Sequence, residues 1–145
     1  MEAKEVERMV FQLDVDAGLL IIRLFVGLIV AAHGAQKLFG WFGGYGLGGV
    51  GGWLESLGFR PGRLWAALAG GSEFFGGLLF ALGLWTPIAA LLIAAVMIVA
   101  LFTVHVKHGL FIDKNGYEYV LILAVVALVI GFLTGPGAYR VSIGG

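Results

Sequence analysis

The sequence predicts an all-α integral membrane protein in which a bundle of four transmembrane helices follows a short amino-terminal helix on the membrane surface. The first observation is composition: 60% of the 145 residues are hydrophobic and 12% are charged, against about 25% charged residues in a typical soluble domain. The second is that apolar runs close to the ~20 residues that cross a bilayer core occur four times along the chain. We expect one membrane domain over residues 1–145.

The amino-terminal stretch MEAKEVERMVFQLDVD has an amphipathic pattern. Val6, Met9, Val10 and Leu13 follow the helical spacing i, i+3, i+4, i+7, which places them on one face opposite the charged side chains. This pattern is typical of a short helix lying on the membrane surface, and a disordered tail is the alternative. The stretch is not a signal peptide, because it is acidic and lacks a basic start and an apolar core.

The apolar spans have aromatic residues near their ends. Trp41, Trp65, Trp85, Tyr117 and Tyr119 fall where amphipathic rings prefer the headgroup level. We call the membrane face where the first span starts side A and the face where it ends side B. The sequence WTP forms a tight turn between the second and third spans. The four expected spans cover residues 17–39, 63–85, 87–108 and 117–134.

Residues 40–62 form a longer connection that is rich in glycine. Gly44, Gly46 and Gly49 have the spacing of a dinucleotide-binding fingerprint, but no strand pattern precedes them and no βαβ unit can follow. Glycines instead let the backbone pack closely at the membrane surface. We interpret the stretch VGGWLESLG as a short interfacial or re-entrant helix.

Ionisable residues inside the spans are the functional candidates, because a charge in a bilayer is costly and usually faces a partner or a functional path. Arg23, His33 and Lys37 share one face of the first span by helical phase. Glu73 has alanine and glycine at helical spacing around it, so it should point at another helix and pair with Arg23 or a histidine. By the rise per residue, His33 and His105 lie at similar depths near side B.

These positions predict a polar pocket that opens near side B. We assign candidate catalytic roles in proton transfer to Glu73 and His105, since carboxylates and imidazoles can be tuned to exchange protons near neutral pH. Cationic and hydrogen-bonding groups that could hold a ligand share the same region. The expected ligand-binding residues are Arg23, His33, Lys37 and His108, with Glu118 at the same level.

Each candidate also has a purely structural interpretation. Lys37 could extend its ammonium group to the headgroups, because it stands at a span end. His108 could be an ordinary loop residue. Arg23 and Glu73 could form an internal ion pair that fixes the packing of the helices.

Composition excludes several chemistries. The chain contains no cysteine, so by itself it cannot exchange disulfides, hold an iron–sulfur cluster or build a Cys-ligated zinc site, and we assign no metal site. Its formal net charge of +0 gives no support for a nucleic-acid partner. His33 and His105 could serve as axial haem ligands, but no haem-attachment motif supports haem binding. A redox role would need a bound cofactor such as a quinone.

Five segments of the chain carry a shared pattern of small, aromatic and ionisable residues: RLFVGLIVAAHGAQKLFGWFGGYG, GSEFFGGLLFALGLWTPIAAL, VHVKHGLF, GYEYVLIL and GPGAYRVSI. Together they resemble the DoxX family. The resemblance implies a compact bundle of four transmembrane helices, and some members resemble the small subunit of a membrane thiosulfate:quinone oxidoreductase. Others are implicated in membrane oxidoreductase complexes with superoxide dismutase and sulfurtransferase partners. The polar positions of the family correspond to Arg23, His33, Lys37, Glu73, His105 and His108, and the acidic amino-terminal tail is the departure.

Three functions follow as expectations. The first is a subunit of a membrane redox complex that binds a quinone or a small sulfur oxyanion. The second is a non-catalytic membrane partner that assembles other proteins, and the third is a carrier for a small molecule. We expect contact with membrane lipid and with protein partners, with a homo-oligomer as a further assembly, and a multi-pass topology in the cell membrane with both termini on one side. Side B carries five lysine and arginine residues against three on side A, which weakly favours side B as cytoplasmic.

Overall fold

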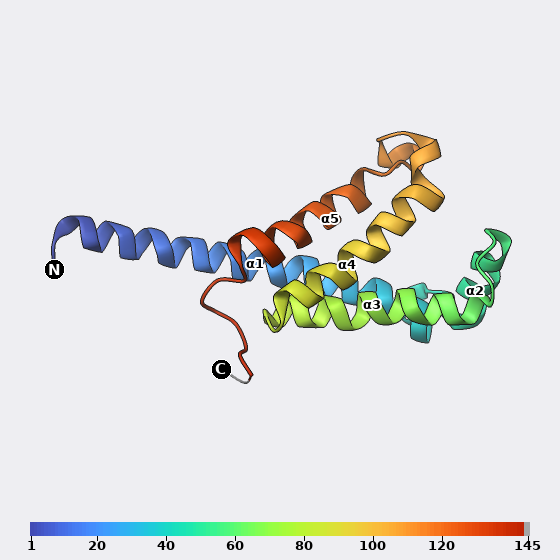
Figure 1. The fold of residues 1–145 in the computed structure, drawn as a ribbon, viewed down its shortest axis with the longest axis horizontal. Helices are drawn as coiled ribbons and strands as arrows, with labels where there is room; N and C mark the ends of the chain where they lie inside the picture. The colour runs from blue at the N-terminus through green and yellow to red at the C-terminus, as the bar shows by residue number, and fades with distance from the viewer. Residues whose placement is uncertain (144–145) are drawn as a thin grey trace.

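A computed structural model describes residues 1–143 of the chain, and every regular element within this range is helical (Figure 1). Two of the long helices are extended at their carboxyl ends by short turns of other helical types. The α-helices are α1 (Ala3–Phe39), α2 (Gly46–Ser56), α3 (Gly62–Leu82), α4 (Thr86–Ala100) and α5 (Glu118–Val129). The shorter elements are η1 (Trp41–Gly43), η2 (Leu101–His105), η3 (Val106–His108), η4 (Ile112–Lys114) and η5 (Ile130–Thr134).

Three helical segments are long and apolar enough to cross a membrane: Ala3–Phe39, Gly62–Leu82 and Thr86–His108. Glu118–Thr134 is apolar but shorter. These segments coincide closely with the four apolar spans expected from the sequence. The protein is therefore an all-helical, multi-pass membrane protein with lipid-facing helices.

The amino-terminal residues belong to α1 and do not form a separate helix. A capping box between Glu2 and Glu5 starts α1, and Gly40 ends it in the left-handed conformation with a φ of 72°. At about 1.5 Å per residue, the 37 residues of α1 are longer than the ~30 Å apolar core of a bilayer. The sequence pattern of residues 3–16 correctly indicated a helix, but its continuity with the first span was not expected.

α1 and α3 pack closely along much of their length because glycines face each other between them. A Cβ atom on Gly27 would lie 2.5 Å from the carbonyl oxygen of Gly77, and one on Gly77 would lie 2.5 Å from the carbonyl oxygen of Gly27. A side chain at either position would therefore push the two backbones apart. This is the small-residue packing that holds membrane helices together where the hydrophobic effect is weak.

α4 and α5 form a second pair that is joined to the first at the turn after α3. Gly83 ends α3 with a φ of 69°, and α4 begins at Thr86 with Pro87 in its first turn. The buried core begins near this turn with Phe80, Ala90 and Ile93 and continues along α4 and α5. Beyond the core, α4 and α5 lean away from α1 and α3 (Figure 1). The two pairs are thus closest near the α3–α4 turn and diverge toward side B.

The long connection between α1 and α3 contains the helix α2, as the sequence indicated. α2 packs against the start of α3, where Gly51 and Gly62 are in close contact. Within residues 1–143 the structure contains no strand, so the glycine spacing at residues 44–49 is not part of a βαβ unit. The glycines allow α2 to lie against the end of the bundle.

The carboxyl-terminal tail returns to the end of the bundle where α1 enters its apolar region. The backbone N–H of Ala138 donates to Asp16 Oδ1 at 3.1 Å, and the N–H of Val141 donates to the carbonyl of Leu82 at 2.9 Å. Residues 135–143 therefore cover the side A end, opposite the opening between the helix pairs.

Candidate functional site

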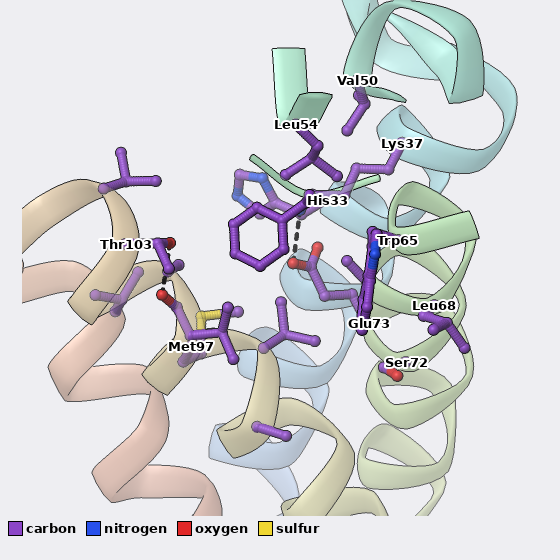
Figure 2. Close-up of a pocket in the computed structure, with 18 of the residues that line it drawn as sticks. His33, Lys37, Val50, Leu54, Trp65, Leu68, Ser72, Glu73, Met97 and Thr103 are labelled. Atoms are coloured by element: carbon purple, nitrogen blue, oxygen red, sulfur yellow. Dashed lines mark hydrogen bonds and ion pairs between the residues drawn. The ribbon is translucent and has the colours of Figure 1, made fainter. Parts of the chain in front are cut away.

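A pocket of about 500 Å³ lies between the diverging helix pairs (Figure 2). It is bounded by the carboxyl-terminal part of α1, by α2, by the first half of α3, by the end of α4 with η2, and by the start of α5. Figure 2 shows Glu73 and Trp65 on α3 facing Met97 and Thr103 on the opposite wall. Most of the lining is apolar, and its polar members are His33, Lys37, Ser72, Glu73, Thr103, His105 and Tyr119.

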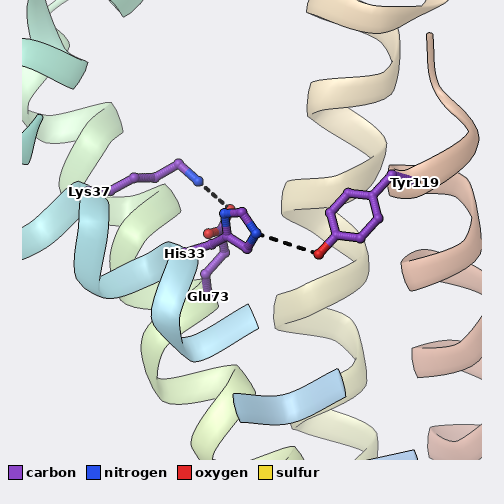
Figure 3. Close-up of polar contacts among 4 residues, drawn as sticks. All are labelled: His33, Lys37, Glu73 and Tyr119. Carbon is purple, nitrogen blue, oxygen red and sulfur yellow. Dashed lines mark hydrogen bonds and ion pairs between the residues drawn. The ribbon is translucent and has the colours of Figure 1, made fainter. Parts of the chain in front are cut away.

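An ion pair joins α1 to α3 at the pocket. Lys37 Nζ lies 2.6 Å from Glu73 Oε1, with 27% of the Lys37 side chain and 3% of the Glu73 side chain exposed. The expectation that Glu73 faces another helix is confirmed, but its partner is Lys37 and not Arg23 or a histidine. Arg23 lies 14 positions before Lys37 on the same helix, about 21 Å away along the axis, which is too far to reach Glu73. Lys37 reaches it because its flexible stem turns back along α1 into the pocket (Figure 3).

The second carboxylate oxygen of Glu73 is buried. Among the residues that the structure describes, no group donates a hydrogen bond to Oε2. Leaving a buried acceptor unpaired costs about 1 to 3 kcal/mol, and more when the group is charged. Glu73 lines the pocket, but Oε2 has essentially no accessible surface, so this oxygen is unpaired inside the packed wall.

His33 and Tyr119 connect α1 to α5 across the pocket. The Tyr119 hydroxyl lies 3.5 Å from His33 Nε2, and the ring centroids are 6.1 Å apart. Figure 3 shows the Tyr119 side chain pointing from α5 toward His33, with the Lys37–Glu73 pair close behind the imidazole. At 3.5 Å the contact is a weak hydrogen bond, so either group could turn to a bound molecule.

Tyr119 was not among the site residues expected from the sequence, because an aromatic residue at a span end is usually a headgroup anchor. The sequence signal that could have identified it is depth, because Tyr119 lies in the first turn of the fourth span, at the level of His33 and His105. Trp53, Trp65 and Thr103 also line the pocket and were not expected there. Their positions depend on the divergence of the helix pairs, which local sequence patterns do not encode.

His105 lines the far side of the pocket from a π-helical segment. α4 changes to a π-helix over Leu101–His105, and Thr103 Oγ1 donates to the carbonyl of Val99 at 2.7 Å. His105 Nδ1 is 2.9 Å from the carbonyl oxygen of Asn115. π-Helical turns occur often at functional sites, since they rotate the following side chains relative to a regular helix. Here the wider turn includes His105 in the pocket wall.

Three other residues expected at the site lie elsewhere. His108 is exposed in the turn η3 and does not line the pocket. Glu118 Oε1 accepts a hydrogen bond from the N–H of Ile112 at 2.8 Å and so orders the preceding loop. The third residue, Arg23, lies at the opposite end of the bundle.

Arg23 holds the carboxyl-terminal tail. The side chain is 1% exposed, and its guanidinium group donates to the carbonyls of Pro136, Ala81 at 3.2 Å and Tyr139 at 2.7 Å. These acceptors are backbone oxygens that residues 135–143 and the end of α3 direct at the cation. Arg23 therefore stabilises the side A end and is not part of the pocket.

The pocket combines apolar walls with one ion pair, two imidazoles and a phenol, a set that can donate, accept and exchange protons at a lipophilic molecule. Across residues 1–143, no group of three or more His, Cys, Asp or Glu side chains is arranged to hold a metal ion.

Comparison with known proteins agrees with this architecture. The sequence model of the DoxX family matches residues 18–106, which include α1 from its apolar part onward, α2, α3 and α4. Neither the curated proteins nor the solved structures gave a match. Since the matched segment covers more than half of the chain and contains the Lys37–Glu73 pair, this multi-pass helical membrane protein belongs to the DoxX family.

Proposed function

We propose that the protein is the membrane subunit of a redox complex and that it binds a quinone in the pocket between the two helix pairs. The observation that carries this proposal is an apolar pocket whose wall contains the buried Lys37–Glu73 ion pair beside His33 and Tyr119. A buried ion pair in a membrane helix is costly and is usually retained for a functional path.

The residues of the pocket fit a quinone by their chemistry. The apolar side chains of Trp65, Leu68 and Met97 suit a ring and an alkyl tail, while Tyr119 and His33 offer hydrogen bonds to a ring oxygen. A bound quinone would supply two-electron chemistry that is coupled to protons. Glu73 and His105 remain our candidates for holding those protons, in line with the roles expected from the sequence.

A small sulfur oxyanion, the other ligand expected from the sequence, fits less well. An anion needs a cation that is not already neutralised. Lys37 is bound to Glu73 at 2.6 Å, and Arg23 binds backbone carbonyls at the opposite end. Both cations that could attract an anion are thus engaged, and we favour the lipophilic ligand.

We further propose that residues 1–145 form one domain in the cell membrane, with four crossings and both termini on side A. The tail contacts to Asp16 and Leu82 support this topology, because they bring the carboxyl-terminal segment to the start of the first apolar span. Partner proteins would exchange electrons with the bound quinone at side B. We also propose that the chain forms a homo-oligomer, which the molecular mass of the purified protein in detergent would test.

The experiment is a binding titration with purified protein in lipid nanodiscs and a short-chain quinone. Trp53 and Trp65 line the pocket, so quenching of their fluorescence reports occupancy. We expect saturable quenching, with an affinity at least tenfold lower for His33→Ala. His108→Ala is the matched control, because His108 lies outside the pocket.

The alternatives predict a different outcome. If the quinone fails to bind and His33→Ala still supports full activity of the native complex, the pocket residues serve packing and the protein is a non-catalytic membrane partner. Binding of other lipophilic molecules without any effect on redox activity would indicate a carrier.

A further inference from the structure

We propose that the pocket opens sideways into the bilayer between α3 and α4, and that its ligand has a long alkyl or isoprenoid tail that lies in this gap. The head group of the ligand then contacts His33 and Tyr119 inside the pocket. This inference rests on the proposed function, because it names the class of quinone that the pocket takes. We call the gap the lateral opening, and its edges are formed by Trp65 and Leu68 on α3 and by Val96 and Val99 on α4.

Each of these two helices lines the pocket with one regular stripe of side chains. Both stripes have the spacing i, i+3, i+4, i+7, which is one face of a helix. Because α3 and α4 lean apart beyond their shared turn (Figure 1), the two stripes form the two edges of the gap. The stripes are Trp65, Leu68, Ala69 and Ser72 on α3, and Val96, Val99, Ala100 and Thr103 on α4 and its η2 extension.

The outer members of both stripes are exposed although they line the pocket. Leu68 and Val99 are each 52% exposed, and Trp65 is 43% exposed. Glu73 and Met97, which line the pocket from the same two helices, are buried. The pocket therefore passes from a buried interior to the outer surface of the bundle along both edges of the gap.

The depth of the lateral opening shows that this outer surface faces lipid. Leu68 lies six positions after the start of α3, and Val99 lies nine positions before the end of the Thr86–His108 segment. At about 1.5 Å per residue these positions are roughly 9 and 14 Å from the side B ends of the helices. They fall within the ~30 Å apolar core of a bilayer, so an exposed side chain there contacts acyl chains.

The other sides of the pocket are covered by the protein. Between α1 and α5 the Tyr119 hydroxyl lies 3.5 Å from His33 Nε2. Toward side B, Val50 and Leu54 of α2 line the pocket, and Figure 2 shows them above the Glu73 carboxylate in the view. The gap between α3 and α4 is therefore the route that a membrane-dissolved molecule would take.

The size and lining of the pocket suit a head group inside and a tail outside. A volume of about 500 Å³ is in the range of about 300 to 1,000 Å³ that holds a drug-sized molecule, so a tail long enough to reach the bilayer centre must leave the pocket. Two polar groups at the edges are already engaged. The Trp65 indole N–H donates to the carbonyl of Arg60 at 3.4 Å, and Thr103 Oγ1 donates to the carbonyl of Val99 at 2.7 Å.

The test compares two benzoquinones with the same head group, one without a tail and one with a decyl tail. Their equilibrium binding to the full chain in nanodiscs is measured by calorimetry, and empty nanodiscs give the partitioning of each probe into lipid. Leu68→Trp and Val99→Trp fill the lateral opening and should weaken binding of the decyl probe at least about tenfold. The tailless probe fits inside the pocket, so its affinity should stay within about threefold.

Leu64→Trp and Ile98→Trp are the matched controls, because both residues are exposed on the same helices and neither lines the pocket. They should leave both affinities within about threefold. If Leu68→Trp and Val99→Trp affect neither probe, or weaken both equally, the tail does not lie between α3 and α4 and the inference is overturned while quinone binding stands. Failure of both probes to bind the unsubstituted protein overturns the proposed function as well.

A photoreactive probe decides the inference even if the tryptophan variants do not fold. The probe is the decyl quinone with a diazirine midway along its tail, bound to the unsubstituted protein and analysed by mass spectrometry after illumination. We expect crosslinks within residues 65–72 and 95–103, which contain the two edges of the lateral opening. Crosslinks confined to α2, or spread evenly over the outer faces of all the helices, would overturn the inference.

Discussion

The side chains of Glu73 and Lys37 differ in solvent exposure. This difference determines how much stability a substitution at either position removes. The carboxylate is almost fully buried, whereas the ammonium side chain is about a quarter exposed, at 27%. Removing Lys37 leaves an uncompensated charge in a low-dielectric region, and removing the charge of Glu73 leaves a cation that can still turn toward the headgroups. The pair is therefore more sensitive to loss of the lysine.

We predict that Lys37→Met lowers thermal stability in detergent more than Glu73→Gln does. Breaking a fully buried pair costs about 3 to 5 kcal/mol, and the partial exposure of Lys37 sets that range as an upper limit. The double variant should lose less than the sum of the two single losses, as coupled residues do. Lys107→Met is the matched control, because Lys107 is exposed in η3; additive losses would show that the pair is not coupled.

Unlike the Lys37–Glu73 pair, the weak His33–Tyr119 contact should contribute little to stability. A hydrogen bond at 3.5 Å contributes little, so Tyr119→Phe should change the free energy of unfolding by less than about 1 kcal/mol while lowering quinone affinity. Thermal unfolding and the quinone titration on the same samples check this. A large loss of stability in Tyr119→Phe would indicate that the tyrosine mainly holds α5 against α1.

At the scale of elements, the close contact of α1 and α3 fixes the position of the ion pair. Lys37 and Glu73 come together because glycines allow the two backbones to approach, at Gly27 and Gly77 and again where Gly34 touches Phe74. The pocket lies beside this contact, between the α1–α3 pair and the α4–α5 pair.

We predict that Gly77→Ala destabilises the protein by several kcal/mol, as overpacked cores do. A Cβ at this position would lie 2.5 Å from the backbone nitrogen of Ala31 and from the carbonyl oxygen of Gly27. Gly71→Ala is the control on the same helix, since nothing lies within 4 Å of a Cβ there, and it should be neutral or stabilising by up to about 1 kcal/mol. Similar unfolding temperatures for the two variants would contradict the close packing of α1 on α3.

The elements themselves were largely predictable, and the site was predictable in part. Hydropathy and the glycine and proline signals located the helices because these signals are local. The small residues around Glu73 correctly placed it against another helix. Lys37 was ambiguous because a lysine at a span end can also extend to the headgroups, and Tyr119 was ambiguous because aromatic residues collect at span ends. The contact of Arg23 with Pro136 joins residues 113 positions apart, which no local pattern can reveal.

At the scale of the whole molecule, polar groups are divided between the two ends. Arg23 and Asp16 bind the carboxyl-terminal tail at side A, while Lys37, Glu73, His33 and Tyr119 surround the pocket toward side B. One end therefore has a structural role and the other carries the candidate chemistry.

We predict that Arg23→Met releases the tail and destabilises the fold. Hydrogen bonds to a charged group contribute about 1.5 to 3 kcal/mol each, and this guanidinium group makes them to the carbonyls of Pro136, Ala81 and Tyr139. Limited proteolysis should then cleave the tail faster than in the control Arg60→Met, whose arginine is exposed at the other end. Protection equal to that of the unsubstituted protein would show that Arg23 does not hold the tail.

The topology gives a further prediction, because the chain contains no cysteine and each introduced thiol is unique. Single cysteines placed at residues 5 and 142 should react with a membrane-impermeant maleimide from the same side of the membrane. Labelling from opposite sides would mean that one of the four apolar helices does not cross.

The tight turn between α3 and α4 is the point from which the α1–α3 pair and the α4–α5 pair diverge (Figure 1). A Cβ at Gly83 would lie 2.9 Å from the guanidinium carbon of Arg23. The cation that binds the tail therefore also packs against this turn. The contacts that hold the carboxyl-terminal tail and the turn that joins the two helix pairs therefore share one buried cation, at the end of the molecule opposite the pocket.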